Sequence, residues 1–317
     1  MSTRALDAAG IVEPRLRASY EQCRRLHLAH GKTYYLATLL LPPAKRPYVH
    51  ALYGFARYAD EIVDELHPAT GVAERAARLA RLRDAFFADL DRGWSDHVVR
   101  RAVVDTVVRW ELPRSHFEAF LESMAMDLTV TSYDTYADLL RYTYGSAAVI
   151  GLQLVPILGP TRPEAYEYAM DLGLAFQLAN FIRDVGEDLD RGRVYLPLDE
   201  LAAHGVDRAM LQRRQVTPQL RAALRDQVAR VRALAERARP GAAMLHPSSR
   251  PCVDAARILY CGIVDAVEAA DYQVFDRRAA VPMSRRLGVA LPAWLHAVLA
   301  RRRFGTGPQP AVSAAGR

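Results

Sequence analysis

Residues 177 to 197 read Gln-Leu-Ala-Asn-Phe-Ile-Arg-Asp-Val-Gly-Glu-Asp-Leu-Asp-Arg-Gly-Arg-Val-Tyr-Leu-Pro and predict a helix with a polar stripe. If the stretch is helical up to about Leu189, four polar side chains recur at steps of three and four residues, and apolar side chains take the other side. These polar residues are Gln177, Asn180, Asp184 and Asp188. Two carboxylates one turn apart repel each other, so a compensating cation is expected. Oxygen ligands suit a hard ion such as Mg²⁺, with Mn²⁺ as a substitute. Alone, the pattern is equally consistent with a solvated face whose acidic spacing is accidental.

A second polar stripe of the same kind lies upstream, in Ala-Leu-Tyr-Gly-Phe-Ala-Arg-Tyr-Ala-Asp-Glu-Ile-Val-Asp-Glu, residues 51 to 65. Helical spacing puts Tyr53, Arg57, Asp60 and Asp64 on one face of this segment. Two Asp-x-x-x-Asp helices can face each other across a cavity and hold several Mg²⁺ ions. Because Mg²⁺ completes its shell with water and phosphate oxygens, such ions would also bind a diphosphate. We therefore expect the four aspartates, Asp60, Asp64, Asp184 and Asp188, to be metal ligands.

Both stripes resemble the two signatures of the squalene and phytoene synthase family, which are Arg-Tyr-Ala-Asp-Glu-Ile-Val-Asp and Asn-Phe-Ile-Arg-Asp-Val-Gly-Glu-Asp-Leu-Asp-Arg-Gly-Arg-Val-Tyr-Leu-Pro in this chain. Members of that family are head-to-head prenyl transferases. The resemblance extends from about residue 19 to residue 290. It implies the all-α isoprenoid synthase fold, a helical bundle around a central cavity.

Composition and patterning agree with a helical protein. Helical periodicity recurs along most of the 317 residues, and strand alternation is nearly absent. Thr161 to Glu164 has the pattern of a capping box, and Thr217 followed by Pro218 that of a helix start. We expect helices at 15–30, 44–66, 72–91, 97–111, 114–128, 135–158, 163–189, 218–239, 250–271 and 289–303.

The chain shows no composition shift that would divide its interior, so we expect one domain over residues 1–304 and a disordered tail over 305–317. The net charge is only +6, and basic and aromatic residues do not alternate as they do in many nucleic-acid-binding segments. We therefore expect no nucleic-acid partner. Three cysteines with no C-x-x-C pair argue against a disulfide framework and favour the cytoplasm. The most apolar run, 147–159, is too short to span a membrane.

The segment His-Gly-Lys-Thr-Tyr, residues 30 to 34, combines an imidazole, an ammonium and a hydroxyl that can bind phosphate oxygens. It is similar to the family's diphosphate-binding pattern His-Ser-x-Ser/Thr-Phe. The resemblance implies substrate-binding roles for His30 and Thr33. Gly31 replaces the first serine and Tyr34 the phenylalanine, so one phosphate contact is expected to be lost. Taken without the resemblance, a His or Thr here is more often a cap or a satisfied polar group.

A later segment is similar to the family's Tyr-x-Tyr-x-x-Ala-Gly-x-Val-Gly helix, which lines the substrate tunnel. The resemblance makes Tyr142 a catalytic residue whose ring stabilises a carbocation; the alternative is a core tyrosine with a hydrogen-bonded hydroxyl. Small residues follow it and allow either close helix packing or space for an apolar ligand. They are Gly145, Ser146, Ala147, Ala148 and Gly151.

Further substrate-binding residues are implied by the loop after the second aspartate helix and by the C-terminal part. From the residues alone, the two arginines of this loop could bind diphosphate or merely pair with Asp184 and Asp188. In the family the Arg-x-Tyr-Leu-Pro loop closes the site, which implies substrate-binding roles for Arg193 and Tyr195. Tyr260 and Arg277 match positions that the family uses near the diphosphates. Gln177 and Asn180 are expected to orient ligands and water, and Tyr53 and Arg57 complete the substrate-binding set.

The resemblance implies Mg²⁺-dependent condensation of two geranylgeranyl diphosphates to phytoene through a cyclopropyl diphosphate, the first committed step of carotenoid biosynthesis. No NADPH is expected. One alternative is a squalene, hydroxysqualene or dehydrosqualene synthase that uses two farnesyl diphosphates. Another is a non-catalytic assembly factor on the same fold, although such a protein would be expected to lose the aspartates.

Basic clusters flank an apolar segment that contains Trp294 between Arg285 and Phe304. This composition is typical of an interfacial helix. It predicts peripheral contact with membrane lipid, at the inner face of the cytoplasmic membrane. The alternative is a last bundle helix with solvated arginines.

Overall fold

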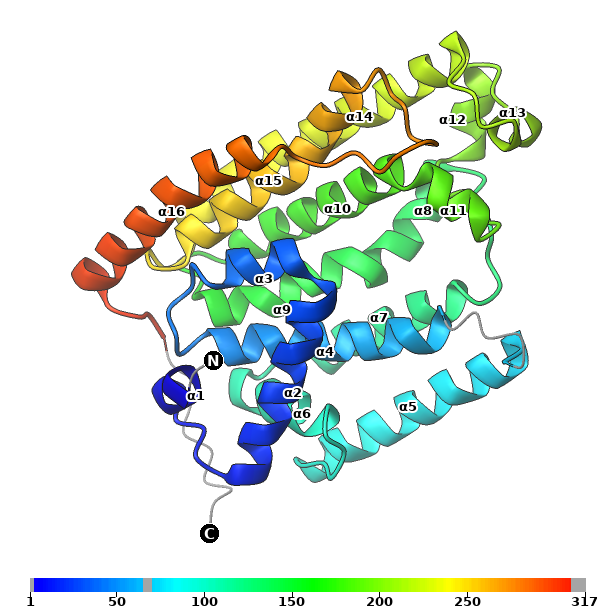
Figure 1. Cartoon of the computed structure of the whole chain (residues 1–317). Coiled ribbons are helices and arrows are strands. Elements are labelled where there is room, and N and C mark those ends of the chain that lie inside the picture. Colours follow the sequence, from blue (N-terminus) through cyan, green and yellow to red (C-terminus); the bar gives the residue numbers. More distant parts are fainter. Residues whose placement is uncertain (1–2, 65–69, 309–317) are drawn as a thin grey trace.

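The computed structural model describes residues 3–64 and 70–308, and this part of the chain is a helical bundle (Figure 1). The expectation of an all-α fold is confirmed, since the described residues contain isolated bridges but no strand. The helices are α1 (Thr3–Ala8), α2 (Pro14–His30), α3 (Lys32–Thr38), α4 (Arg46–Val63), α5 (Val72–Arg92), α6 (Arg100–Trp110), α7 (Arg114–Met126), α8 (Tyr136–Thr143), η1 (Tyr144–Ala148), α9 (Val149–Leu158), α10 (Ala165–Arg183), α11 (Val185–Asp190), α12 (Leu198–Ala203), α13 (Arg208–Gln212), α14 (Pro218–Ala238), η2 (Arg239–Met244), α15 (Arg250–Ala269) and α16 (Met283–Phe304).

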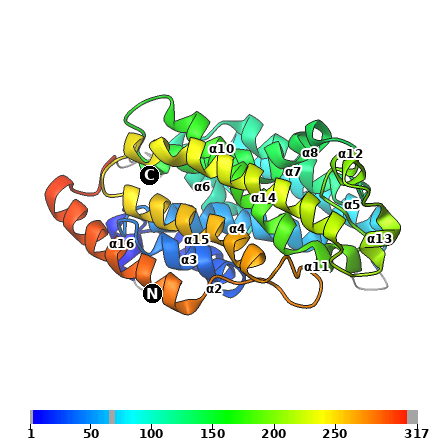
Figure 2. The same cartoon turned by 90° about the horizontal axis from the view of Figure 1, so that it is seen from above.

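Three apolar clusters hold the bundle together. The first joins α2, α4, α5, α6 and α7, and its centre is aromatic: the rings of Phe55 and Phe86 lie 4.4 Å apart between centroids, and Phe117 packs against both. The second joins α8, α10, α14 and α15. The third joins α3, α9, α15 and α16. Seen from above, α14, α15 and α16 cover one side of the bundle, so α4 and α10 are interior helices (Figure 2). The aspartate motifs lie at the C-terminal ends of these two helices.

The expected helix over 163–189 is interrupted at Asp184, which separates α10 from α11. Its backbone leaves the helical range, at φ −100° and ψ 11°. The N–H of Gly186 bonds to the carbonyl of Val274 in the C-terminal segment, at 3.3 Å. A Cβ at Gly186 would lie 2.8 Å from that same carbonyl oxygen, so only glycine permits this approach. The second aspartate motif therefore turns a corner at its first aspartate.

The two capping predictions have different outcomes. The Thr217 hydroxyl accepts from the N–H of Leu220 at 3.2 Å and caps α14, as expected. The capping box at Thr161 is wrong: its hydroxyl instead bonds to the Met244 carbonyl at 2.9 Å, and α10 starts later, without a side-chain cap. A long-range contact has replaced the local one.

The small residues after Tyr142 serve both of the purposes considered for them. Added Cβ atoms at Gly145 and Gly151 would lie 2.0 Å and 2.5 Å from the carbonyl oxygens of Ala119 and Ala169, so the glycines allow neighbouring helices to approach closely. Ser146, Ala147 and Gly151 also line a cavity. A π-helical turn over Tyr144–Ala148 interrupts the helix expected at 135–158.

None of the helices in the described ranges is long and apolar enough to cross a bilayer. The three cysteines are free thiols. In the tail, residues 305–308 pass beside Gly159 and His246. Residues 309–317, for which disorder is expected, lie outside the described part of the chain.

Candidate active site

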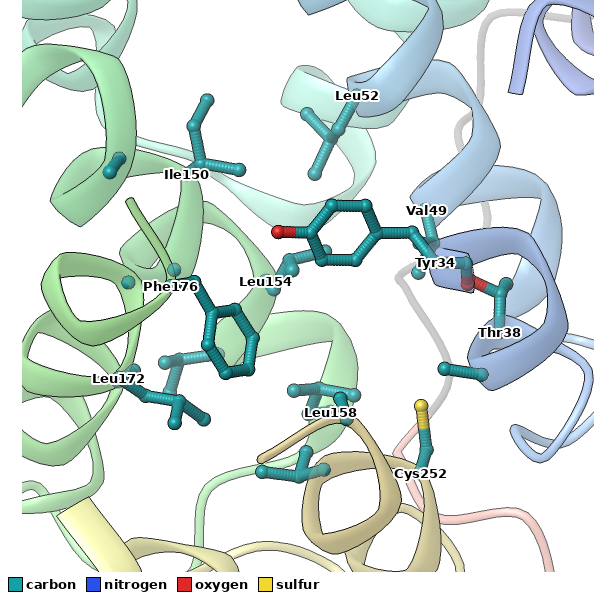
Figure 3. Close-up of a pocket in the computed structure, with 18 of the residues that line it drawn as sticks. Tyr34, Thr38, Val49, Leu52, Ile150, Leu154, Leu158, Leu172, Phe176 and Cys252 are labelled. Carbon is teal, nitrogen blue, oxygen red and sulfur yellow. The ribbon is translucent and has the colours of Figure 1, made fainter. Parts of the chain in front are cut away.

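An apolar cavity of about 360 Å³ lies inside the bundle, between α3, α4, α9, α10 and α15. Tyr34 and Phe176 reach into it from α3 and α10, with Leu52 on one side and Leu158 and Cys252 on another (Figure 3). Its walls are aliphatic and aromatic side chains, so the cavity suits a hydrocarbon chain.

A polar cavity of about 530 Å³ adjoins the apolar one. Tyr34, Tyr53 and Asn180 line both cavities and mark their junction. The polar cavity is also lined by several basic side chains, which are typical of an anion site. These are His30, Lys32, Arg183, Arg278 and Arg286.

Aromatic packing fixes the junction between the cavities. The ring of Tyr34 stacks on that of Tyr260 at 4.1 Å between centroids, and Phe176 packs against Tyr260 at 4.7 Å. Asn180 lines the same junction, and its buried Oδ1 has no hydrogen-bond partner among the residues that the structure describes. A buried acceptor without a partner is costly, so this oxygen is available to a ligand.

The first aspartate pair lies at the C-terminal end of α4. Arg57 donates to Asp60 at 2.6 Å and to Glu61 at 3.1 Å. Partial burial raises the pKa of Asp60, and the nearby carboxylate of Asp64 raises it further. Asp64 accepts from Arg191 at 2.9 Å. Arg57, which was predicted to bind substrate, pairs here with two carboxylates of its own helix and lines neither cavity.

The second pair lies at the corner between α10 and α11. Arg183 and Arg278 each bind both carboxylate oxygens of Asp184, at 2.6–2.7 Å. Burial opposes ionisation of Asp184, but these four charge-assisted hydrogen bonds outweigh it and lower its pKa. Asp188 has the opposite environment: burial and the neighbouring Asp184 raise its pKa to about 7.

The loop after α11 links the two pairs. Arg193 approaches Asp64 at 3.4 Å and donates to the main-chain oxygen of Asp127 at 2.8 Å. Arg191, in the same loop, holds Asp64 as well as Glu187. Both aspartate motifs therefore border the same space, with arginines between them.

Sequence reasoning missed Asp127, which organises three of the predicted residues. Its carboxylate accepts from the hydroxyls of Tyr142 at 2.7 Å and Tyr195 at 2.9 Å. Burial raises the pKa of Asp127 to about 6, against the opposing effect of these bonds and of Arg193. One signal in the sequence could have identified it. Asp127 is a single acidic residue among apolar ones, in the run Met-Ala-Met-Asp-Leu at residues 124–128.

The structure places Tyr142 in the core, 3% exposed, and it lines neither cavity. Its ring packs against those of Tyr133 and Tyr195. This is the arrangement of the alternative considered for it, a core tyrosine with a hydrogen-bonded hydroxyl.

Three further predicted residues line one cavity or the other, and one does not. Thr33 lines the polar cavity with His30, which lies 3.6 Å from Glu61, and Gln177 lines the apolar one. Arg277 is exposed and lines neither, whereas its neighbour Arg278 lines the polar cavity. Lys32, whose ammonium was considered from the sequence as a phosphate ligand, also lines the polar cavity. Arg183, Arg278 and Arg286 had not been selected from the sequence.

The replacement of serine by Gly31 has a structural reason. An ideal Cβ at this position would lie 2.6 Å from the ring of Tyr53 and 2.7 Å from its hydroxyl oxygen. The Tyr53 ring is itself stacked on His27 at 4.0 Å. The tyrosine therefore occupies the space of the missing serine side chain and presents a hydroxyl there.

The carboxylates of the two aspartate pairs are oxygen ligands of the type that a divalent cation such as Mg²⁺ prefers. Within residues 3–64 and 70–308, no three His, Cys, Asp or Glu side chains gather closely enough to form a complete metal site. Mg²⁺ requires only one or two carboxylates, because water and phosphate oxygens complete its shell. Burial and then a neighbouring carboxylate raise the pKa values of Asp60 and Asp188, and a bound cation would offset both effects. The Oδ1 of Asn180 is a further hard oxygen.

Comparisons with known proteins show which proteins the chain is similar to. A family model described as squalene/phytoene synthase matches residues 28–285. The chain is 37% identical to phytoene synthase 3 of Zea mays over 92% of its own length and 71% of that protein. It is 36% identical to 15-cis-phytoene synthase of Synechocystis, over 88% and 85% of the two lengths.

Solved structures give the same result. A dehydrosqualene synthase in complex with a ligand has a TM-score of 0.80 at 26% identity, covering 88% of this chain and 96% of the other. Squalene synthase HpnC of Alicyclobacillus acidocaldarius has a TM-score of 0.76 at 27% identity, covering 84% and 98%. The expected isoprenoid synthase fold is thereby confirmed.

Proposed function

Because the chain belongs to the squalene/phytoene synthase family and is therefore a prenyltransferase, we propose that it joins two molecules of geranylgeranyl diphosphate head to head to give phytoene. The name phytoene synthase, carried by the relatives in Zea mays and Synechocystis, supports the 20-carbon substrate. One observation carries the proposal: an apolar cavity meets a polar cavity lined by basic side chains at Tyr34, Tyr53 and Asn180. Two of those basic side chains, Arg183 and Arg278, bind Asp184 of the second aspartate pair.

Substrate binding follows from this arrangement. The prenyl chain lies in the apolar cavity, and the diphosphate lies in the polar cavity among Lys32, Arg183 and Arg278. Thr33, His30 and the hydroxyl of Tyr53 add hydrogen bonds, with Tyr53 taking the place of the serine that the family pattern has at Gly31. Asn180 and Gln177 orient ligands where the cavities meet. Of the two arginines at positions 277 and 278, we assign the diphosphate contact to Arg278 in place of Arg277.

Asp60, Asp64, Asp184 and Asp188 would hold Mg²⁺, or Mn²⁺ in its place. When bound, the metal supplies positive charge that neutralises the leaving diphosphate. The arginines that now pair with Asp64 and Asp184 are placed to move to the same diphosphate. They are Arg191, Arg193, Arg183 and Arg278.

The reaction is a sequence of cationic steps. The C1–O bond of the first substrate breaks, the electron pair leaves with diphosphate, and the double bond of the second substrate captures the allylic cation. Loss of a proton closes a cyclopropyl diphosphate. Departure of its diphosphate, rearrangement and loss of a second proton give the polyene. The steps are redox-neutral, so no NADPH is required, and the apolar cavity keeps water from the cations.

Tyr142 acts in this scheme as a positioning residue. Its hydroxyl holds Asp127, and Asp127 in turn holds Tyr195 and, through its main-chain oxygen, Arg193. The network fixes the loop that closes over the aspartates.

We expect the enzyme to work in the cytoplasm at a membrane surface, because a 40-carbon hydrocarbon must leave into lipid.

Diphosphate release tests the proposal. With geranylgeranyl diphosphate and Mg²⁺ we expect two diphosphates for each hydrocarbon formed, with activity lost in EDTA and restored by excess Mg²⁺ or Mn²⁺. Hydrolysis would contradict the proposal, since it would release one diphosphate for each free alcohol and form no hydrocarbon. Activity that EDTA does not affect would also contradict it. A chain that releases none under any condition would be the non-catalytic assembly factor.

A further inference from the structure

Helix α16 is packed with its small residues inward and its large apolar residues outward. Ala293 and Ala297 are buried at 9% and 0% exposure. The opposite face carries a leucine at every fourth position and Trp294 beside them, and these side chains are 52–61% exposed. They are Leu287, Leu291, Trp294, Leu295 and Leu299; we call them the outer face of α16. A helix that faces only water has the reverse arrangement.

The outer face is at the edge of the molecule. Both views place α16 along α15, with no other described helix on its far side (Figures 1 and 2). Five leucine and tryptophan side chains in one stripe form a larger exposed apolar surface than scattered single residues would. Such a surface indicates an interaction site.

The charge of α16 indicates which kind of partner binds its outer face. Its 22 residues include five arginines and no acidic residue. Arg285 is neutralised by Asp265 at 2.8 Å, and Arg301 caps main-chain oxygens of Leu41 and Ala297. Arg302 and Arg303 are exposed, and no carboxylate pairs with either among the described residues. A surface with an apolar stripe and uncompensated cations matches an anionic lipid leaflet.

A second copy of the chain is a poorer match. A symmetric contact would place one α16 against another, and neither helix has a carboxylate to face the arginines. Trp294 also favours lipid, because tryptophan is enriched at membrane–water interfaces. We infer that the outer face of α16 docks the protein on an anionic membrane, with Arg302 and Arg303 at the headgroups.

The inner face of α16 connects this surface to the site. Ala293 and Ala297 belong to the same apolar cluster as Leu41, Leu158 and Cys252, which line the apolar cavity. Only this step rests on the proposed function: a hydrocarbon made in that cavity would be separated from lipid by a single apolar layer of the bundle.

Vesicle co-sedimentation tests the inference, with phosphatidylcholine alone or in an equal mixture with phosphatidylglycerol. We expect binding to the mixed vesicles only. Arg302→Gln/Arg303→Gln should weaken it about thirtyfold, and Leu291→Glu/Leu295→Glu should abolish it. The matched control is Val12→Glu/Val98→Glu, which makes the same charge change at residues 78% and 51% exposed on other elements, and should bind as the wild type does.

Folding and activity are measured separately. Circular dichroism should show all variants folded, and turnover in detergent micelles should be unchanged by Leu291→Glu/Leu295→Glu. Vesicle binding that survives this change, or no binding to mixed vesicles, would overturn the inference; a dimer in light scattering that the same change dissociates would identify a second copy as the occupant. Vesicle binding without hydrocarbon synthesis would leave the docking surface in place and refute only the proposed function.

Discussion

The phenolic hydroxyl of Tyr142 lies 2.7 Å from Oδ2 of Asp127, and both groups are buried away from the two cavities. Through the other oxygen of the carboxylate this contact reaches Tyr195, and through the main-chain oxygen it reaches Arg193. A residue selected for its aromatic ring is therefore connected to the aspartates through its hydroxyl. Its contribution is to the position of the closing loop.

The first prediction concerns Asp127. Its pKa of about 6 means that acidification through this value protonates the carboxylate and removes an acceptor from Tyr142 or Tyr195. Turnover should therefore decline below about pH 6. Asp127→Asn keeps the shape of the side chain and should remove this part of the pH profile. An identical acid limb in the variant would show that another group titrates.

The same shift has a consequence for stability. The folded protein holds this proton more tightly than the unfolded chain does. The stabilisation that it contributes is therefore present at low pH and is lost as pH rises through about 6. Asp127→Asn should remove that loss, which thermal unfolding at pH 5 and pH 8 would reveal.

The metal proposal predicts the effect of neutralising single aspartates. Asp60→Asn and Asp184→Asn each remove a charged oxygen ligand and should lower turnover at least about a hundredfold, with the helical fold retained. The Mg²⁺ concentration for half-maximal activity should rise for any residual turnover. Near wild-type turnover of both variants at saturating Mg²⁺ would exclude these residues as ligands.

Adjacent arginines provide a matched pair. Arg278 binds Asp184 with two hydrogen bonds and lines the polar cavity, whereas Arg277 lines neither cavity. Arg278→Gln removes a bidentate, charge-assisted contact and should lower kcat/KM about ten- to a hundredfold. Arg277→Gln should have little effect. The reverse result would return the substrate contact to Arg277.

Gly31 tests the role of Tyr53. Gly31→Ser restores the residue of the family pattern, yet its Cβ would lie 2.6 Å from the Tyr53 ring. The ring would have to leave its stack on His27, so we expect higher KM for the diphosphate and a loss of about 1–3 kcal/mol in stability. Tyr53→Phe should raise KM without that loss. A gain of affinity in Gly31→Ser would mean that the serine hydroxyl binds phosphate there after all.

Local sequence patterns predicted the helices well because their apolar periodicity is the same periodicity that the bundle buries. The two aspartate motifs were visible for the same reason, since both follow helical spacing in the sequence, although the second crosses the corner between α10 and α11. The break at Asp184 was not visible, because its cause is the carbonyl of Val274, far along the chain.

Long-range pairing also explains the missed site residues. Arg278 meets Asp184 across 94 residues of sequence, and Tyr195 meets Asp127 across 68. Single-sequence periodicity carries no information on such pairs. The resemblance assigned Arg277 by alignment of the segment, while the fold turns the next residue towards the cavity.

Identification of the hydrocarbon product tests the central claim most directly. The purified chain is incubated with Mg²⁺ and either the 15-carbon or the 20-carbon diphosphate, with and without NADPH, and the products are identified by mass spectrometry. We predict phytoene from geranylgeranyl diphosphate, in equal amount without NADPH. Squalene formed from farnesyl diphosphate with a strict requirement for NADPH, or dehydrosqualene or hydroxysqualene as the sole product, would contradict the account.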